Sequence, residues 1–156
     1  MKRKFRKISI GIDVGGSGIK GAPVSLNTGK FLDERLRIPT PENGSPTEIA
    51  AIIKQIADSF ELPDEIPVGV SFPAPIVNGV VPMIANLSQE WKDMRISELL
   101  TKTLRRPITV INDADAAGYA EVHFGAAHRH DGTIIVLTRH WNWFSTRTKR
   151  HTFTKF

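Results

Sequence analysis

One stretch near the start of the chain decides the fold: Lys7-Ile-Ser-Ile-Gly-Ile-Asp13, followed by Val14-Gly-Gly-Ser-Gly18. The first part alternates and is rich in β-branched residues, which predicts a strand that ends at Asp13. The second part predicts a tight turn, and we expect its glycines to adopt positive φ and to present N–H groups to an anion. Ile19–Ser25 then predicts a second strand, so the stretch is a hairpin closed by glycines.

The residues that follow alternate between strands and helices. Ser45 begins a Ser-Pro-Thr-Glu capping box, and the apolar residues after it have helical spacing. The other predicted elements are a strand over Lys30–Ile38, a strand over Ile66–Phe72, a hairpin within Pro73–Pro82, a helix over Arg95–Leu104, a strand over Pro107–Ile111, a helix over Ala114–Phe124 and a strand over Thr133–Thr138. This βββαβαβα order predicts an α/β fold, the ribonuclease-H-like or actin-like ATPase lobe. Enzymes of this class use two such lobes, and this would be the first.

Composition narrows the classes of partner. The formal net charge is +5 with a pI of about 9.7, which would suggest a nucleic-acid partner. The segment after Thr138 contains five basic residues and no acidic one, so the formal net charge of residues 1–138 is zero. We therefore expect no nucleic-acid partner. The chain has no cysteine and no apolar run of membrane-spanning length. We therefore expect a cytoplasmic protein without disulfides.

The sequence changes character after Thr138. The residues beyond it show no periodicity and include Trp141 and Trp143. Tryptophan has the single codon TGG, so reading one base later turns both residues into glycines one residue apart, as in a phosphate loop. We interpret 139–156 as an out-of-frame, disordered tail. The predicted organisation is a first lobe over 1–130, the opening strand of a truncated second lobe over 131–138, and this tail.

The first candidate site is the glycine turn. A strand delivers Asp13 to the edge of the sheet, and the turn can hold phosphate through its N–H groups. The candidate phosphate-binding residues are Asp13, Gly15, Gly16, Ser17, Gly18 and Lys20. The pattern is neither a Walker loop nor a Rossmann fingerprint, because GxxxxGK[ST] is absent and a strand follows the turn. The alternative is a plain hairpin turn.

A second candidate site follows the predicted strand Pro107–Ile111. Phosphorylation of a hydroxyl benefits from a base that accepts its proton, and we choose Asp113 for that role, with Asn112 orienting the hydroxyl. The alternative is that Asp113 only caps the helix. Asn86 is a candidate for binding sugar hydroxyls, and Trp91 either lines the sugar site or packs inside the protein.

Taken together, these motifs resemble the ROK-family sugar kinases, and their pattern is that of the polyphosphate glucokinase branch. The matching residues are Asp13-x-Gly-Gly-Ser-x-x-Lys20, Phe72-Pro73 with Asn78-Gly79, Asn86 with Trp91, and Asn112-Asp-Ala-Asp-Ala-Ala117. The resemblance implies phosphoryl transfer to the 6-hydroxyl of glucose, with polyphosphate or ATP as donor and Mg²⁺ as cofactor. It implies that Asp113 is the base, that Asn86 and Asn112 bind glucose, and that Gly15–Gly18 is a phosphate loop. Asp13 would reach the metal through water, and full-length relatives would be homodimers.

The chain departs from this family in one respect. We expect it to lack the second lobe, with the second phosphate loop and a Glu-x-Gly-His motif. A half-site has no cleft to close, so we predict little or no kinase activity and poor solubility for the chain alone. The alternatives are a non-enzymatic sugar- or nucleic-acid-binding fragment, another actin-fold ATPase such as an acetate-kinase-like or chaperone-like protein, or a non-functional relic.

Overall fold

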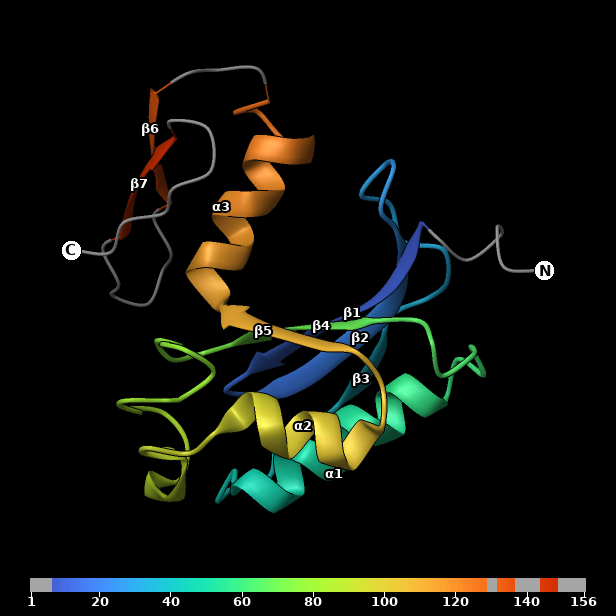
Figure 1. Ribbon diagram of the computed structural model, residues 1–156, viewed down its shortest axis with the longest axis vertical. Helices are drawn as coiled ribbons and strands as arrows, with labels where there is room; N and C mark the ends of the chain where they lie inside the picture. Colours follow the sequence, from blue (N-terminus) through green and yellow to red (C-terminus); the bar gives the residue numbers. More distant parts are fainter. Residues whose placement is uncertain (1–6, 129–131, 137–143, 149–156) are drawn as a thin grey trace. The chain divides into compact units, whose positions relative to one another are not determined.

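The computed structural model describes residues 7–128, 132–136 and 144–148 (Figure 1). Contacts divide the chain into two compact units, Met1–Asn112 and Asp113–Phe156. The first unit contains a five-stranded sheet and two α-helices, and the second contains one helix and a two-stranded sheet. Each unit is described by itself.

The five-stranded sheet combines an antiparallel half with a parallel half. Its strands are β1 (Ile8–Gly15), β2 (Gly18–Ser25), β3 (Leu36–Ile38), β4 (Val68–Phe72) and β5 (Ile108–Asn112), in the spatial order β3-β2-β1-β4-β5. The first three strands form an antiparallel meander, while β4 runs parallel to β1 and β5 runs parallel to β4. The predicted α/β class, with a meander before parallel strands, is confirmed.

The third strand is shorter than the sequence predicts. The prediction covered Lys30–Ile38, whereas β3 covers only Leu36–Ile38, preceded by a single bridge between Phe31 and Val24. Asp33, Glu34 and Arg35, which come directly before β3, are charged and exposed, and the Asp33 carboxylate accepts a hydrogen bond from the backbone N–H of Glu34. Acidic residues are poor strand formers, and this local hydrogen bond competes with pairing to β2.

Two helices cover one face of the sheet, as Figure 1 shows. They are α1 (Pro46–Asp58) and α2 (Ile96–Leu104). The predicted capping box is present: the Ser45 hydroxyl accepts from the N–H of Glu48, and the Glu48 carboxylate accepts from Ser45. These bonds from Ser45, first of all from its side chain, lower the pKa of Glu48. The core between sheet and helices contains Ile10, Ile12, Val14, Ile49, Ile53, Ile56, Val68, Val70, Phe72 and Leu100.

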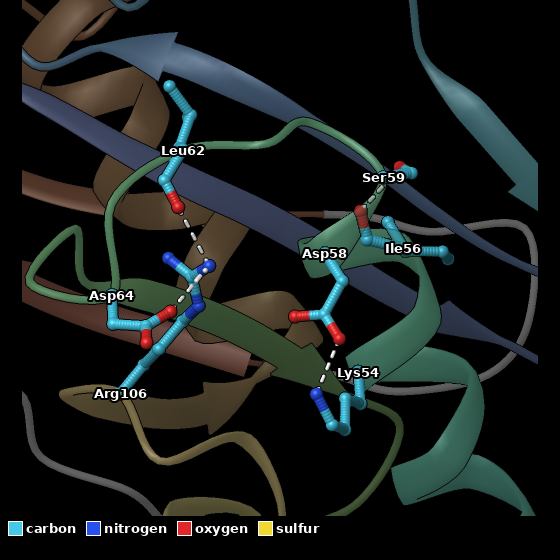
Figure 2. A network of polar contacts seen from close by, with 7 residues as sticks. All are labelled: Lys54, Ile56, Asp58, Ser59, Leu62, Asp64 and Arg106. Atoms are coloured by element: carbon cyan, nitrogen blue, oxygen red, sulfur yellow. Dashed lines mark hydrogen bonds and ion pairs between the residues drawn. The ribbon is translucent and has the colours of Figure 1, made fainter.

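A buried arginine joins the segments that lead into β4 and β5 (Figure 2). The Arg106 guanidinium donates to the backbone carbonyls of Pro63 at 2.6 Å and Leu62 at 2.8 Å, and forms an ion pair with Asp64 at 3.1 Å. Its side chain is only 4% exposed, whereas that of Asp64 is 81% exposed. Burial of a charge is tolerated when it is hydrogen-bonded, so Arg106 fixes the starts of the two parallel strands against each other.

The predicted hairpin at Asn78 and Gly79 is confirmed. Val77 and Val80 pair across it, and both turn residues have positive φ, at 51° and 76°. Two positive φ values are the geometry of a tight two-residue hairpin turn, for which an Asn-Gly pair is the favoured sequence.

The second unit contains α3 (Asp113–Phe124) and a two-stranded antiparallel sheet of β6 (Gly132–Val136) and β7 (Phe144–Thr148). The predicted strand Thr133–Thr138 corresponds to β6, and its last two residues lie outside the described residues. Most of the tail predicted to be disordered, 139–143 and 149–156, also lies outside them. Where the structure does describe that tail, it contains β7. In the described parts of the chain, no helix has both the length and the apolarity to cross a bilayer.

Candidate functional site

The carboxyl ends of β1, β4 and β5 lie side by side, because these three strands are parallel neighbours. This is the edge at which α/β sheets place their sites. Asp13 lies there on β1 and is paired in register with Ser71 on β4. The Ser71 hydroxyl donates a hydrogen bond of 2.6 Å to Oδ1 of Asp13, which fixes the carboxylate. Sequence reasoning missed Ser71, although its place near the end of a predicted strand was a usable signal.

The glycine turn joins β1 to β2 through two residues, Gly16 and Ser17, between the paired Gly15 and Gly18. The prediction of positive φ in this turn is wrong, because the glycines with positive φ in the described residues are Gly29, Gly44 and Gly79. Close approach explains the glycine at one position instead. A Cβ on Gly18 would lie 2.7 Å from Nε of Arg37, whereas a Cβ on Gly16 would meet nothing within 4 Å. The turn is therefore open to an approaching ligand at Gly16.

Two residues from beyond the hairpin hold the carbonyl groups of the turn. Nη2 of Arg37 donates to the carbonyl oxygen of Ser17 at 2.7 Å, and the hydroxyl of Thr40 donates to that of Gly15 at 2.5 Å. Carbonyl oxygens repel anions, and here both accept hydrogen bonds from protein donors. Sequence reasoning missed Arg37 and Thr40, since nothing in local spacing connects them to a turn about twenty residues earlier.

Lys20 belongs to the same face as Asp13. The two residues are direct partners in the β1–β2 register, and Lys20 is also the direct partner of Arg37 on β3. Residues that are directly opposite in a ladder project to the same face of the sheet. The register therefore brings Lys20 beside the other phosphate-site candidates.

Asn112 ends β5 and is buried, with 3% of its surface exposed. Its Nδ2 donates to the carbonyl oxygen of Ala74 at 3.0 Å, which ties the segment after β4 to the end of β5. Asn86, in contrast, lies exposed in the loop before the short 3₁₀ helix η1 (Gln89–Trp91). The two candidate sugar-binding residues thus differ: one is held inside the protein and the other is open to solvent.

Trp91 is a core residue, so the interpretation that it lines a sugar site is wrong. It is fully buried, its ring lies 4.6 Å from that of Phe72, and its Nε1 donates to the carbonyl of Gly44 at 2.8 Å. A buried indole needs such a partner for its N–H. The alternative stated from the sequence, a packed tryptophan, is the correct one.

Asp113 is the first residue of α3 and belongs to the second unit. Its Oδ1 accepts a hydrogen bond of 2.9 Å from the backbone N–H of Ala114, and its side chain is exposed. Asp115 lies in the same first turn, where the helix dipole favours negative charge. This local geometry is that of an exposed carboxylate at the start of a helix.

Residues 9–139 match the ROK family, and the chain belongs to that family. It is similar to the polyphosphate glucokinase of Mycobacterium tuberculosis, with 37% identity over 129 residues, which are 82% of this chain and 48% of that protein. The chain thus spans about half the length of the curated relatives it matches. The family match ends one residue after Thr138, where the sequence changes character.

Solved structures give the same result. The inorganic polyphosphate/ATP-glucomannokinase of Arthrobacter sp. strain KM has 42% identity and a TM-score of 0.84, over 90% of this chain and 57% of that one. The ROK family glucokinase of Streptomyces griseus, solved with glucose and AMPPNP, has 22% identity and a TM-score of 0.70, over 95% of this chain and 48% of that one. The second match shows a shared fold. Together they confirm the predicted actin-like ATPase lobe.

Proposed function

We propose that the chain is the first lobe of a kinase that transfers a phosphoryl group to the 6-hydroxyl of glucose, with polyphosphate or ATP as donor. One observation carries the proposal. The glycine turn and the Asp13–Ser71 pair lie at the carboxyl edge of the sheet in a ROK-family chain that is 42% identical to a polyphosphate/ATP-glucomannokinase. Such a kinase needs positioning and charge stabilisation more than covalent chemistry.

The donor side of the reaction is assigned to the turn. Gly15, Gly16, Ser17 and Gly18 would present N–H groups and a hydroxyl to phosphate oxygens. Lys20 would add positive charge from the same face. The bonds from Arg37 and Thr40 to the turn support this role, because a turn that is held in place before the ligand arrives loses less entropy on binding.

The acceptor side is assigned to three residues. Asp113 would accept the proton of the glucose hydroxyl as the new P–O bond forms. Asn112, whose amide also holds Ala74, would orient the hydroxyl and fix the end of the strand that leads into Asp113. Asn86 would bind another sugar hydroxyl from its exposed loop.

Kinases of this type use a divalent metal, and we propose Mg²⁺. Mg²⁺ keeps several waters and usually takes only one or two carboxylates besides the substrate phosphates. The residues fit that pattern: residues 7–128 contain no cluster of three or more metal-binding side chains, and Asp13 offers an exposed carboxylate beside the phosphate turn. Asp13 would therefore hold the ion, directly or through water. When bound, the ion would neutralise charge on the donor phosphates.

A direct assay and a chimera test the proposal. The 156-residue chain is expected to form no glucose 6-phosphate above an Asp113→Ala control, because closing over the substrate needs a second lobe. Residues 1–138 joined to the second half of the Arthrobacter enzyme are expected to be active. Replacing Asp113 by Asn in that chimera should lower kcat by about 10²–10⁴-fold. A folded chimera that is inactive, or is unaffected by Asp113→Asn, would contradict the proposal.

We further propose that the residues after Thr138 are read out of frame, that the complete protein is a cytoplasmic homodimer, and that 1–130 forms the first lobe. Sequencing the gene through codon 138 tests the first point. The shifted frame is expected to remain open and to encode Glu-x-Gly-His. A stop codon soon after the shift would contradict it.

A further inference from the structure

One short segment of the first unit contacts both halves of the proposed site. It runs from Thr40 to Gly44, between β3 and α1, and is called the bridging segment below. At its start, the Thr40 hydroxyl donates to the carbonyl oxygen of Gly15 in the glycine turn at 2.5 Å. At its end, Gly44 contacts the loop that carries Asn86. A segment of this length spans at most about 14 Å between its outer Cα atoms, so its two ends are close together.

Gly44 holds the Asn86 loop through two contacts. Its carbonyl oxygen accepts a hydrogen bond of 2.8 Å from Nε1 of the buried Trp91. Its Cα lies against Leu87, the neighbour of Asn86, since a Cβ on Gly44 would lie 2.8 Å from Cδ2 of Leu87. Gly44 also has a φ of 55°, a conformation that glycine adopts without strain. A larger residue at this position would therefore displace Leu87, and Asn86 with it.

The sequence restricts the backbone of the bridging segment. Prolines stand on both sides of Thr40, at Pro39 and Pro41, and each fixes its own φ at about −65°. A proline also limits the residue before it to extended conformations, and here that residue is Thr40. Directly after Gly44, Ser45 caps α1 through the capping box. The bridging segment thus has few backbone angles with which to absorb a displacement of either end.

We propose that Thr40 and Gly44 are positioning residues that hold the glycine turn and the Asn86 loop at a fixed distance from each other. In the proposed kinase, the turn holds the donor phosphate and Asn86 holds the sugar. The bridging segment then sets how far the transferred phosphoryl group lies from the acceptor hydroxyl. A misplacement of about 1 Å between reacting groups can lower the rate about 10²-fold. This inference rests on the proposed function and adds to it two residues that act through the turn and the loop.

The first test requires no activity and uses NMR of the isotope-labelled 156-residue chain. Thr40→Val keeps the shape of the side chain and removes its hydroxyl. Signals are expected to shift at Gly15, which the hydroxyl contacts, and also at the Trp91 indole N–H and the Asn86 side-chain amide, at the other end of the bridging segment. Thr40→Ser, which retains the hydroxyl, should restore the wild-type signals.

Thr103→Val is the matched control. The Thr103 hydroxyl donates to the carbonyl oxygen of Leu99 at 2.8 Å within α2, so this variant loses the same kind of bond outside the bridging segment. It should leave the signals of Asn86 and Trp91 unchanged. If those signals were also unchanged in Thr40→Val, the proposal would be wrong, because the two ends would not be connected. Equal shifts in Thr40→Val and Thr103→Val would likewise overturn it, since they would reflect a general loss of stability.

The second test measures the kinetics of the chimera described above. Thr40→Val and Gly44→Ala are each expected to lower kcat about tenfold and to change the KM for glucose and for the donor less than twofold, because they move the two substrates apart without removing a contact to either. The double variant should lower kcat by less than the product of the two single effects, since both substitutions break the same connection.

A purely local role gives a different kinetic result. Thr40→Val would then raise only the KM for the donor, Gly44→Ala would raise only the KM for glucose, and the two effects would multiply in the double variant. That result would refute the positioning role while leaving the proposed function intact. A folded chimera without activity would instead contradict the proposed function, and the NMR comparison would still decide whether the bridging segment connects the turn to the Asn86 loop.

Discussion

The two faces of the first unit's sheet differ in the residues that they carry, although the same strands build both. On one face, Ile12 and Val70 are buried beneath α1 and α2. On the other face, the register aligns Asp13, Lys20 and Ser71 at the level of the glycine turn. Because side chains alternate along a strand, the buried Ile12 and Val70 are next to Asp13 and Ser71, which belong to the opposite face. Stability and function can therefore be changed separately in adjacent residues.

The comparison of the two faces predicts the largest loss of stability for a substitution at the end of β4. Phe72 is fully buried and packs against Trp91, while its neighbour Ser71 points to the opposite face. Phe72→Ala is expected to lower the free energy of unfolding by about 3–5 kcal/mol, enough to unfold a marginal domain. Ser71→Ala, the matched control, should cost less than about 1 kcal/mol, since it removes one hydrogen bond to an exposed carboxylate. Urea denaturation of both variants checks this, and similar losses would show that the faces are not independent.

A smaller effect is expected at the buried arginine shown in Figure 2. Arg106→Leu removes two hydrogen bonds from a charged donor to the Leu62 and Pro63 carbonyls, at a cost of about 3 kcal/mol. Asp64→Asn leaves those bonds in place and changes only an exposed partner, so its cost should be about 0–1 kcal/mol. The difference in denaturation midpoint between the two variants is the measurement. If Asp64→Asn lowered the denaturation midpoint as much as Arg106→Leu, the ion pair and not the hydrogen bonds to the carbonyls would hold together the segments that lead into β4 and β5.

Alanine substitutions at one glycine on each face of the sheet give a third comparison of stability. A Cβ on Gly21 would lie 2.5 Å from Cγ2 of the buried Ile56, whereas a Cβ on Gly69 would meet nothing within 4 Å. Gly21→Ala should therefore overpack the core and cost about 2 kcal/mol. Gly69→Ala should be neutral or slightly stabilising, because alanine restricts the unfolded chain. Thermal denaturation of both variants tests this. A melting temperature that falls in Gly69→Ala would mean that another group packs closely against Gly69 on the face opposite α1 and α2.

Much of the fold could be predicted because it is encoded locally. The capping box at Ser45, the Asn78-Gly79 turn and the alternation in β1 each depend on residues within a few positions of one another. The third strand was predicted too long because the charged residues Asp33, Glu34 and Arg35 interrupt the pairing between the bridge at Phe31 and the strand that begins at Leu36.

The site was only partly predictable, because its supporting contacts are distant in sequence. Asp13 and the turn are visible as a motif, but Ser71 and Arg37 reach them from other strands. Trp91 illustrates the opposite error, since a tryptophan near candidate sugar-binding residues suggests a ligand until its burial is known. The roles of Asp113, Asn112 and Asn86 stay predictions, as do the domain boundaries.

The smallest predicted effect is a change of stability with pH at the capping box of α1. The hydroxyl and N–H of Ser45 hold the pKa of Glu48 below its usual value of 4.5. A group whose pKa is lower in the folded state stabilises the fold above its unfolded pKa, and that stabilisation disappears as the pH falls through the folded pKa. Because Glu48 is fully exposed, the contribution should be small. Wild type and Glu48→Gln should therefore differ slightly in melting temperature near pH 6, and the difference should begin to shrink near the unfolded pKa of glutamate, about 4.3, and disappear as the pH falls through the lower folded pKa. A difference that stays constant over this range would show that the carboxylate charge does not contribute to the cap.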